Sequence, residues 1–237
     1  MDPNQPAPDP GQLILIDKPR EWTSFDVVNK IRRACKIKKI GHAGTLDPLA
    51  TGLLILCTGK MTKQIDSYQA QEKEYTGTLV LGKTTPSVDL ETEFDGEFDT
   101  SEITHEQVRA AAAQLTGDIQ QIPPIYSAIR VNGERLYERA RRGETADQVE
   151  GGIKSRAVTV STFNVMTNDF PTIDFRIVCS KGTYVRSLVR DLGLLLNNGA
   201  YMSVLRRTRI GEFDVKDAHT VEGFIETYLK SHDSQSQ

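Results

Sequence analysis

Cysteine and histidine are scarce in this chain, and those present are scattered. The 237 residues include only three cysteines, Cys35, Cys57 and Cys179, and no two of them have the C-x-x-C spacing. An odd number of isolated cysteines argues against a disulfide framework and is typical of reduced, cytoplasmic thiols. The four histidines lie too far apart in the sequence to indicate a zinc motif. We therefore predict a cytoplasmic protein without a bound metal.

Long apolar runs and nucleotide-binding motifs are also lacking. No segment stays apolar over the roughly 20 residues that a membrane-spanning helix needs, and no basic-then-apolar signal peptide stands at the start. The tripeptide at residues 58–60, Thr-Gly-Lys, resembles the end of a phosphate-binding loop, but the full G-x-x-x-x-G-K-[ST] pattern is absent. We expect no membrane association and no cofactor.

The charge is weakly negative in total but unevenly distributed. The formal net charge is −3, and residues 89–106 carry eight acidic side chains without a lysine or arginine. Three cationic clusters stand elsewhere: Lys30, Arg32, Arg33, Lys36, Lys38 and Lys39; Arg130, Arg135, Arg139, Arg141 and Arg142; and Arg206, Arg207 and Arg209. The negative total therefore leaves room for a basic face that binds an anionic partner. Taken alone, each cluster is more often a solvated helix face.

The most unusual stretch is residues 41–52, GHAGTLDPLATG, followed by the apolar run LLILC. Its glycines allow a positive φ or a close approach of the backbone, and Pro48 stiffens the turn after Asp47. The apolar run lacks polar alternation, which is typical of a strand that is covered on both faces. Asp47 in such a turn is ordinarily a turn cap. A carboxylate held against a buried strand is also a candidate for a functional group.

The rest of the chain indicates a mixture of helices and strands. We expect strands at residues 12–16, 74–81, 126–131, 157–166 and 172–179, and through Leu205 to Thr208; we expect helices at 25–35, 61–68, 104–115, 184–196 and 217–230. Phe25, Val28 and Ile31 are expected on one buried helix face, and Thr183 is expected as an N-cap. Residues 89–100 read as an acidic, mobile surface loop.

Three further polar residues have alternative interpretations. Arg186 falls in the first turn of its helix, where the helix dipole disfavours a cation, so either it has a specific anionic partner or it is exposed. Lys18 ends the first strand and is either solvated or paired with a carboxylate or phosphate. Tyr75 begins a strand, where a half-buried core position is the ordinary interpretation.

Two dense motifs carry a family resemblance. The stretch around Asp47 and residues 179–193, CSKGTYVRSLVRDLG, resemble the TruB-type tRNA pseudouridine synthases, which isomerise uridine 55 in the T-arm of tRNA. The segments IDKP and WTSFDVV before Asp47, and PPIYSAIRVNGERLYERARRG between the two motifs, also resemble the family and stand in its order. The resemblance covers residues 12–230. It implies an α+β fold with a mixed, largely antiparallel sheet, flanking helices and a central active-site cleft.

The same resemblance implies a domain plan. Residues 12–230 would form the catalytic domain between a disordered tail at residues 1–11 and a polar tail at residues 231–237. Many relatives continue into a small RNA-binding PUA domain, and this sequence has no segment expected to form one.

The resemblance also implies roles for particular residues. Asp47 would be the nucleophile and Arg186 its partner, which favours the ionised carboxylate. Tyr75 would stack on the target base and is a candidate for the later removal of the C5 proton. Tyr184 would lie beside the base, and Leu205 would contact it from beneath.

Two more residues are candidates for binding the RNA. His42 could stack on or hydrogen-bond the displaced RNA, and Lys18 could bind a carboxylate or phosphate near the site. The base of a folded T-loop is inaccessible and should be flipped out. The implied partner is tRNA, bound by a monomer without metal or cofactor.

Two other function classes compete with this interpretation. One is a non-catalytic protein that binds or folds tRNA with the same surface. The other is an unrelated hydrolase with an Asp nucleophile, which would need a second acid, a base or a metal-binding cluster beside Asp47.

Overall fold

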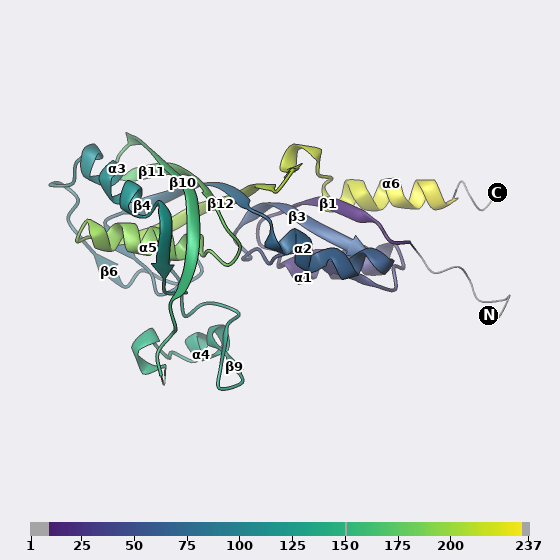
Figure 1. Ribbon diagram of the computed structural model, residues 1–237, viewed down its shortest axis with the longest axis horizontal. Helices are drawn as coiled ribbons and strands as arrows, with labels where there is room; N and C mark the ends of the chain where they lie inside the picture. Colours follow the sequence, from purple (N-terminus) through teal and green to yellow (C-terminus); the bar gives the residue numbers. More distant parts are fainter. Residues whose placement is uncertain (1–9, 150, 234–237) are drawn as a thin grey trace. The chain divides into compact units, whose positions relative to one another are not determined.

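A computed structural model describes residues 10–149 and 151–233 of the chain, shown in Figure 1. The predicted disordered tail at residues 1–11 falls almost wholly outside the described residues, as do residues 234–237 of the predicted polar tail. The chain forms two compact units. Unit 1 comprises Met1–Glu74 and Arg206–Gln237, and unit 2 comprises Tyr75–Leu205. We describe each unit by itself.

Unit 1 is a small sheet with helices on both faces. Its elements are β1 (Leu13–Lys18), α1 (Ser24–Ala34), β2 (Ile40–His42), β3 (Thr51–Thr58), the 3-10 helix η1 (Gly59–Gln64), α2 (Ile65–Ala70), the end of β12 (Ala200–Ile210), β13 (Phe213–Asp214), the 3-10 helix η3 (Val215–Asp217) and α6 (Val221–Asp233). Strand β3 is central: it pairs antiparallel with β1 and β2, and parallel with β12.

Strand β3 is buried on both faces, as its unbroken apolar sequence predicts. Leu54 and Leu56 pack into a cluster with α1 and α6, while Leu53 and Ile55 on the opposite face pack into a cluster with residues of α2 and β13. The alternation of neighbouring side chains between the two faces of a strand explains how one apolar run serves both clusters.

The prediction that Phe25, Val28 and Ile31 form the buried face of α1 is wrong for Phe25. Ser24, Val27, Val28 and Ile31 are buried, whereas 61% of Phe25 is exposed. The buried set follows the i, i+3, i+4, i+7 spacing of one helix face, and Phe25 falls outside it. The N-terminus is closed by a capping box between Thr23 and Asp26.

Unit 2 contains the larger part of the sheet. Its elements are β4 (Lys73–Leu81), β5 (Lys83–Thr84), β6 (Gly96–Glu97), α3 (His105–Gln114), β7 (Gly117–Gln121), β8 (Arg130–Val131), β9 (Glu134–Arg135), α4 (Leu136–Arg141), the 3-10 helix η2 (Ala146–Gln148), β10 (Arg156–Asp169), β11 (Thr172–Cys179), α5 (Val185–Leu195) and most of β12. The strand order is β12-β4-β11-β10-β7, and helices α3 and α5 contact each other beside β10 (Figure 1).

Most predicted elements of unit 2 are present. The antiparallel hairpin of β10 and β11 and the capped helix α3 are confirmed, as is the mixed, mostly antiparallel α+β fold. The predicted strand at residues 126–131 is wrong except at Arg130–Val131, because the chain turns tightly where the Ser127 N–H donates to the Ile125 carbonyl. The N-cap of α5 is Tyr184 and not Thr183.

Two helices also have other bounds than predicted. The expected helix at residues 61–68 is η1 followed by α2, and the final helix begins at Val221 and not at Asp217. This helix runs to Asp233, past the predicted start of the polar tail at residue 231. Within the described ranges, no helix combines the length and apolar character that spanning a bilayer requires.

Candidate active site

The loop that carries Asp47 is fixed by backbone hydrogen bonds inside unit 1. Asp47 is half-buried, and its carbonyl accepts from the Ala50 N–H at 3.1 Å, which closes the turn. Ser24 of α1 holds the preceding residue: its Oγ accepts from the Leu46 N–H at 2.9 Å and donates to the Leu46 carbonyl at 3.3 Å. The backbone at Asp47 is therefore held by a helix start on one side and a turn on the other.

Arg207 of β12 lies beneath this loop and is almost fully buried, with 1% of the residue exposed. Its guanidinium donates to three main-chain carbonyls: Leu53 at 2.8 Å, Gly44 at 3.2 Å and Thr45 at 3.5 Å. Gly52 pairs with Arg207 across the strands, and its φ of +103° and the close approach explain the glycine. A Cβ at Gly52 would lie 2.2 Å from the Arg207 carbonyl oxygen.

Lys18 is the second buried cation behind the loop. It has no exposed surface, and its ammonium donates to the carbonyls of Pro19 at 2.9 Å, Pro48 at 3.2 Å and Trp22. Burial lowers the pKa of Lys18 to about 8, an effect that the negative charge of Asp47 opposes. The interpretation of Lys18 as a solvated lysine is therefore wrong. All three of its N–H groups are directed at main-chain carbonyls.

His42 ends β2, at the entrance to the same loop. Burial lowers the pKa of its imidazole, and the positive charge of Arg207 lowers it further. The neutral form is consequently favoured at neutral pH, which suits an aromatic ring that stacks or hydrogen-bonds and does not carry a charge.

The other candidate residues belong to unit 2, where Arg186 is the most tightly held. With 5% of the residue exposed, it donates to the carbonyls of Ser87 at 3.0 Å and Tyr126 at 2.7 Å. Its Nε also lies 3.7 Å from an Oδ atom of Asp89. A buried arginine with an anionic neighbour corresponds to the first of the two interpretations above, and the exposed alternative is wrong.

Asp89 is the acidic neighbour of Arg186, and the sequence interpretation assigned it to a mobile surface loop. That assignment is wrong at this position: only 3% of Asp89 is exposed, and Met202 of β12 forms an isolated bridge with it. The hydroxyl of Thr85 donates to the Asp89 carbonyl at 2.6 Å, and the carboxylate accepts from the Glu91 N–H at 3.0 Å. The acidic run thus begins in the core and reaches the surface only afterwards.

Tyr184, Tyr75 and Leu205 supply aromatic and apolar surface in unit 2. Tyr184 precedes α5, while Tyr75 in β4 and Leu205 in β12 are buried, with 9% and 7% of each residue exposed. Tyr75 is therefore more deeply buried than a half-buried strand end. The structure thus divides the candidates between two units, with Asp47, His42 and Lys18 in unit 1.

The three cationic clusters differ in how far the fold itself uses them. In the third cluster, Arg206 pairs with Asp17 at 2.7 Å and Arg209 with Glu72 at 3.0 Å, while Arg207 is buried. The second cluster forms ion pairs from Arg139 to Glu144, Arg141 to Glu91 and Arg142 to Glu134. Most members of the second and third clusters are therefore ion-paired or buried within the fold.

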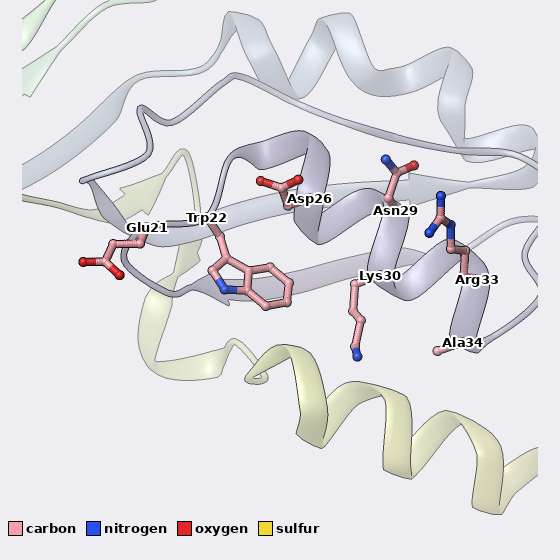
Figure 2. A pocket seen from close by; sticks show the side chains of 7 residues that line it. All are labelled: Glu21, Trp22, Asp26, Asn29, Lys30, Arg33 and Ala34. Carbon is pink, nitrogen blue, oxygen red and sulfur yellow. The ribbon is translucent and has the colours of Figure 1, made fainter. Parts of the chain in front are cut away.

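The first cluster is different, because five of its six cations are exposed: Lys30, Arg33, Lys36, Lys38 and Lys39. Within the described parts of the chain, none of the five takes part in an ion pair. Lys30 and Arg33 also line an open pocket along α1, together with Trp22 and Asn29. Figure 2 shows the Trp22 ring and the Lys30 side chain on the side of α1 that faces α6. None of the predicted site residues lines this pocket.

Family models account for most of the chain. The N-terminal domain of the TruB family pseudouridylate synthases matches residues 32–185, and the C-terminal domain of tRNA pseudouridylate synthase B matches residues 186–237. The chain belongs to the TruB family of tRNA pseudouridine synthases. It is accordingly an enzyme that isomerises uridine in tRNA.

Individual relatives agree with this assignment. The chain is 51% identical over 224 residues to tRNA pseudouridine synthase B of Flavobacterium johnsoniae, covering 92% of this chain and 96% of the relative. The enzyme of the same name from Phocaeicola vulgatus is 48% identical, with 91% and 92% covered.

Solved structures agree with the fold. A chain of a Cbf5-Nop10-Gar1 complex superposes with a TM-score of 0.72 at 27% identity. The superposition covers 94% of the present chain and 56% of the chain in that complex. A chain of an H/ACA ribonucleoprotein bound to a substrate RNA containing 2′-deoxyuridine gives 0.68 at 25% identity, with 94% and 55% covered.

Proposed function

We propose that the enzyme isomerises uridine 55 in the T-loop of tRNA, with Asp47 as the nucleophile that attacks a flipped-out uridine. The observation that carries this proposal is the support of the Asp47 loop. Two buried cations, Lys18 and Arg207, donate to six main-chain carbonyls in and around that loop. A nucleophile that must attack and leave again needs a fixed position, and the charge of Lys18 interacts favourably with the Asp47 carboxylate.

The reaction exchanges one bond to the ribose for another. The N1–C1′ bond breaks, the base turns, the C5–C1′ bond forms, the C5 proton leaves and N1 takes up a proton. In this proposal Arg186 pairs with the Asp47 carboxylate, Tyr75 stacks on the base and accepts the C5 proton, and Tyr184 and Leu205 hold the uracil. His42 stacks on or hydrogen-bonds the displaced RNA. The catalytic unit is a monomer formed by residues 12–230.

The test is tritium release from an unmodified tRNA transcript labelled at uridine C5. Wild type should release tritium, and replacement of the T-loop uridine by cytidine should abolish that release. The Asp47→Asn variant should bind the transcript as wild type does and release nothing. Turnover by this variant would refute the role of Asp47, whereas release that survives the cytidine replacement would refute position 55.

A further inference from the structure

The helix that carries Arg186 begins without a cap of its own. Tyr184 is the N-cap of α5, and its side chain makes no capping hydrogen bond. The first N–H groups of a helix have no partner within the helix, so an N-cap side chain ordinarily fixes the first turn. The start of α5 must therefore be fixed by groups from elsewhere in unit 2.

Gln121 supplies that fixation from the end of β7. Its side chain is fully buried, and both ends of its amide are bound to the backbone of one residue. The Oε1 atom accepts from the Tyr184 N–H at 2.7 Å, and Nε2 donates to the Tyr184 carbonyl at 3.1 Å. The amide thus pairs with Tyr184 as a neighbouring strand would, and it fixes both the position and the direction of the chain there.

Arg156 holds the side chain of the same tyrosine. It lies directly opposite Gln121 in the antiparallel pair of β10 and β7. Its guanidinium carbon lies 5.4 Å from the centre of the Tyr184 ring, within the range of a cation–π contact. Two facing residues of paired strands therefore contact Tyr184, one through its backbone and one through its ring.

The residue after Gln121 holds the next part of the helix. The Ile122 carbonyl accepts from the Ser187 hydroxyl and from the Arg190 guanidinium, both at 2.9 Å. The Tyr126 carbonyl accepts from Arg186. The end of β7 and the segment after it therefore set the first turn of α5, and Gln121 is the point at which that contact begins.

We propose that Gln121 and Arg156 are positioning residues for the isomerisation. Gln121 fixes the backbone at Tyr184 and thereby the start of the helix that carries Arg186, and Arg156 fixes the plane of the Tyr184 ring. The inference rests on the proposed roles of Tyr184 and Arg186. It predicts that changes at these two positions lower kcat, the rate at which bound tRNA is isomerised, more than they weaken tRNA binding.

Gln121→Glu makes the proposal testable through pH. A glutamate can accept from the Tyr184 N–H in either form, but it can donate to the Tyr184 carbonyl only when it is protonated. Burial of a side chain with no exposed surface favours the protonated form against the opposing charge of the facing Arg156, so this carboxyl should titrate above the range of an exposed glutamate. We expect kcat to be at least tenfold below wild type at pH 8. The ratio of variant to wild-type kcat should then rise severalfold as the pH falls to 5.5.

Gln120→Glu is the matched control, because Gln120 is exposed on the same strand and receives the same change of charge. Its kcat ratio should stay near one at every pH. A Gln121→Glu ratio that does not change with pH, or that equals the control, would overturn the role of Gln121. If that variant does not fold, Gln121→Met removes both hydrogen bonds at similar volume. It should lower kcat while KM stays within about twofold, and an unchanged kcat would overturn the role equally.

Arg156 is tested by a pair of variants. Arg156→Met removes the cation from the ring and should lower kcat, and Arg156→Lys should restore part of the loss because it keeps a cation. Equal activity of the methionine variant and wild type would overturn this half of the proposal. All variants use the tritium-release assay, with wild type as the reference. Failure of the wild-type reaction refutes the proposed function, whereas a working wild type with unaffected variants refutes only the positioning roles.

Discussion

Arg207 gives the sharpest test of how the Asp47 loop is held, because it is buried and its main-chain partners are known. In Arg207→Met, a side chain of similar length fills the space but leaves the carbonyls of Leu53, Gly44 and Thr45 without this donor. A hydrogen bond to a charged group contributes about 1.5–3 kcal/mol. Counting the 2.8 Å bond in full and the two longer bonds at about half, the loss is about 3–6 kcal/mol.

Urea unfolding followed by tryptophan fluorescence measures this loss, since Trp22 is the chain's single tryptophan and lies in unit 1. With an m-value of about 3 kcal/mol/M, the midpoint should fall by roughly 1–2 M. Arg207→Lys keeps the charge but reaches fewer carbonyls, so its loss should be intermediate. At a temperature where both variants stay folded, kcat should also fall, because a displacement of about 1 Å at a reacting group can cost 100-fold in rate.

Arg206→Met is the control for this prediction. Arg206 neighbours Arg207 on the same strand, but 38% of its side chain is exposed and its ion-pair partner is Asp17. Exposed ion pairs contribute about 0.2–1 kcal/mol, so the midpoint of this variant should barely move. If Arg207→Met were no less stable than Arg206→Met, the carbonyl contacts would not support the loop and the reasoning would fail.

Three further predictions concern the same framework. Gly52→Ala should lower the free energy of unfolding by at least about 2 kcal/mol more than Gly117→Ala in urea titrations, because both glycines have a positive φ but only the Cβ at Gly52 meets the backbone. The free energy of unfolding of wild type should rise between pH 8 and about pH 10 relative to Lys18→Met. The reason is that the Lys18 pKa is about 8 in the folded protein, so the unfolded chain binds more protons in that window; parallel curves from urea titrations at each pH would contradict it. Asp89→Asn should lose about 1–3 kcal/mol in the same titrations and reduce kcat, since it leaves Arg186 without the carboxylate charge of its buried partner; equal stability would show that the pair contributes little.

Local sequence patterns predicted much of the secondary structure, because the interactions that form those helices and strands are local. The capping boxes at Thr23 and Thr104 and the apolar run of β3 are decided within one turn or one strand. The exceptions also have local causes, as in the tight turn at Ser127 that interrupts a predicted strand. The roles of Asp47 and Arg186 came from the family resemblance and not from such patterns.

The polar residues behind the site were missed because their partners are distant in the sequence. The carbonyls that accept hydrogen bonds from Arg207 belong to residues more than 150 positions away. In the sequence, Arg207 is only one more cation in a basic cluster. One signal was available: Arg207 stands two positions after Leu205 in a strand, which places both on one face. Asp89 gave no such signal, since it opens an acidic run whose other members are mostly exposed.

The two buried cations indicate what the Asp47 loop is built to hold. Burying a cation costs free energy unless it is compensated, and the lowered pKa of Lys18 shows that carbonyl partners compensate it only in part. Lys18 and Arg207 also repel each other, which adds to the cost. The negative charge of Asp47 opposes the shift at Lys18, so its attraction to the Lys18 ammonium recovers part of this energy. The fold thus holds two cations behind the Asp47 loop at a desolvation cost, and this places positive charge beside the carboxylate that is proposed as the nucleophile.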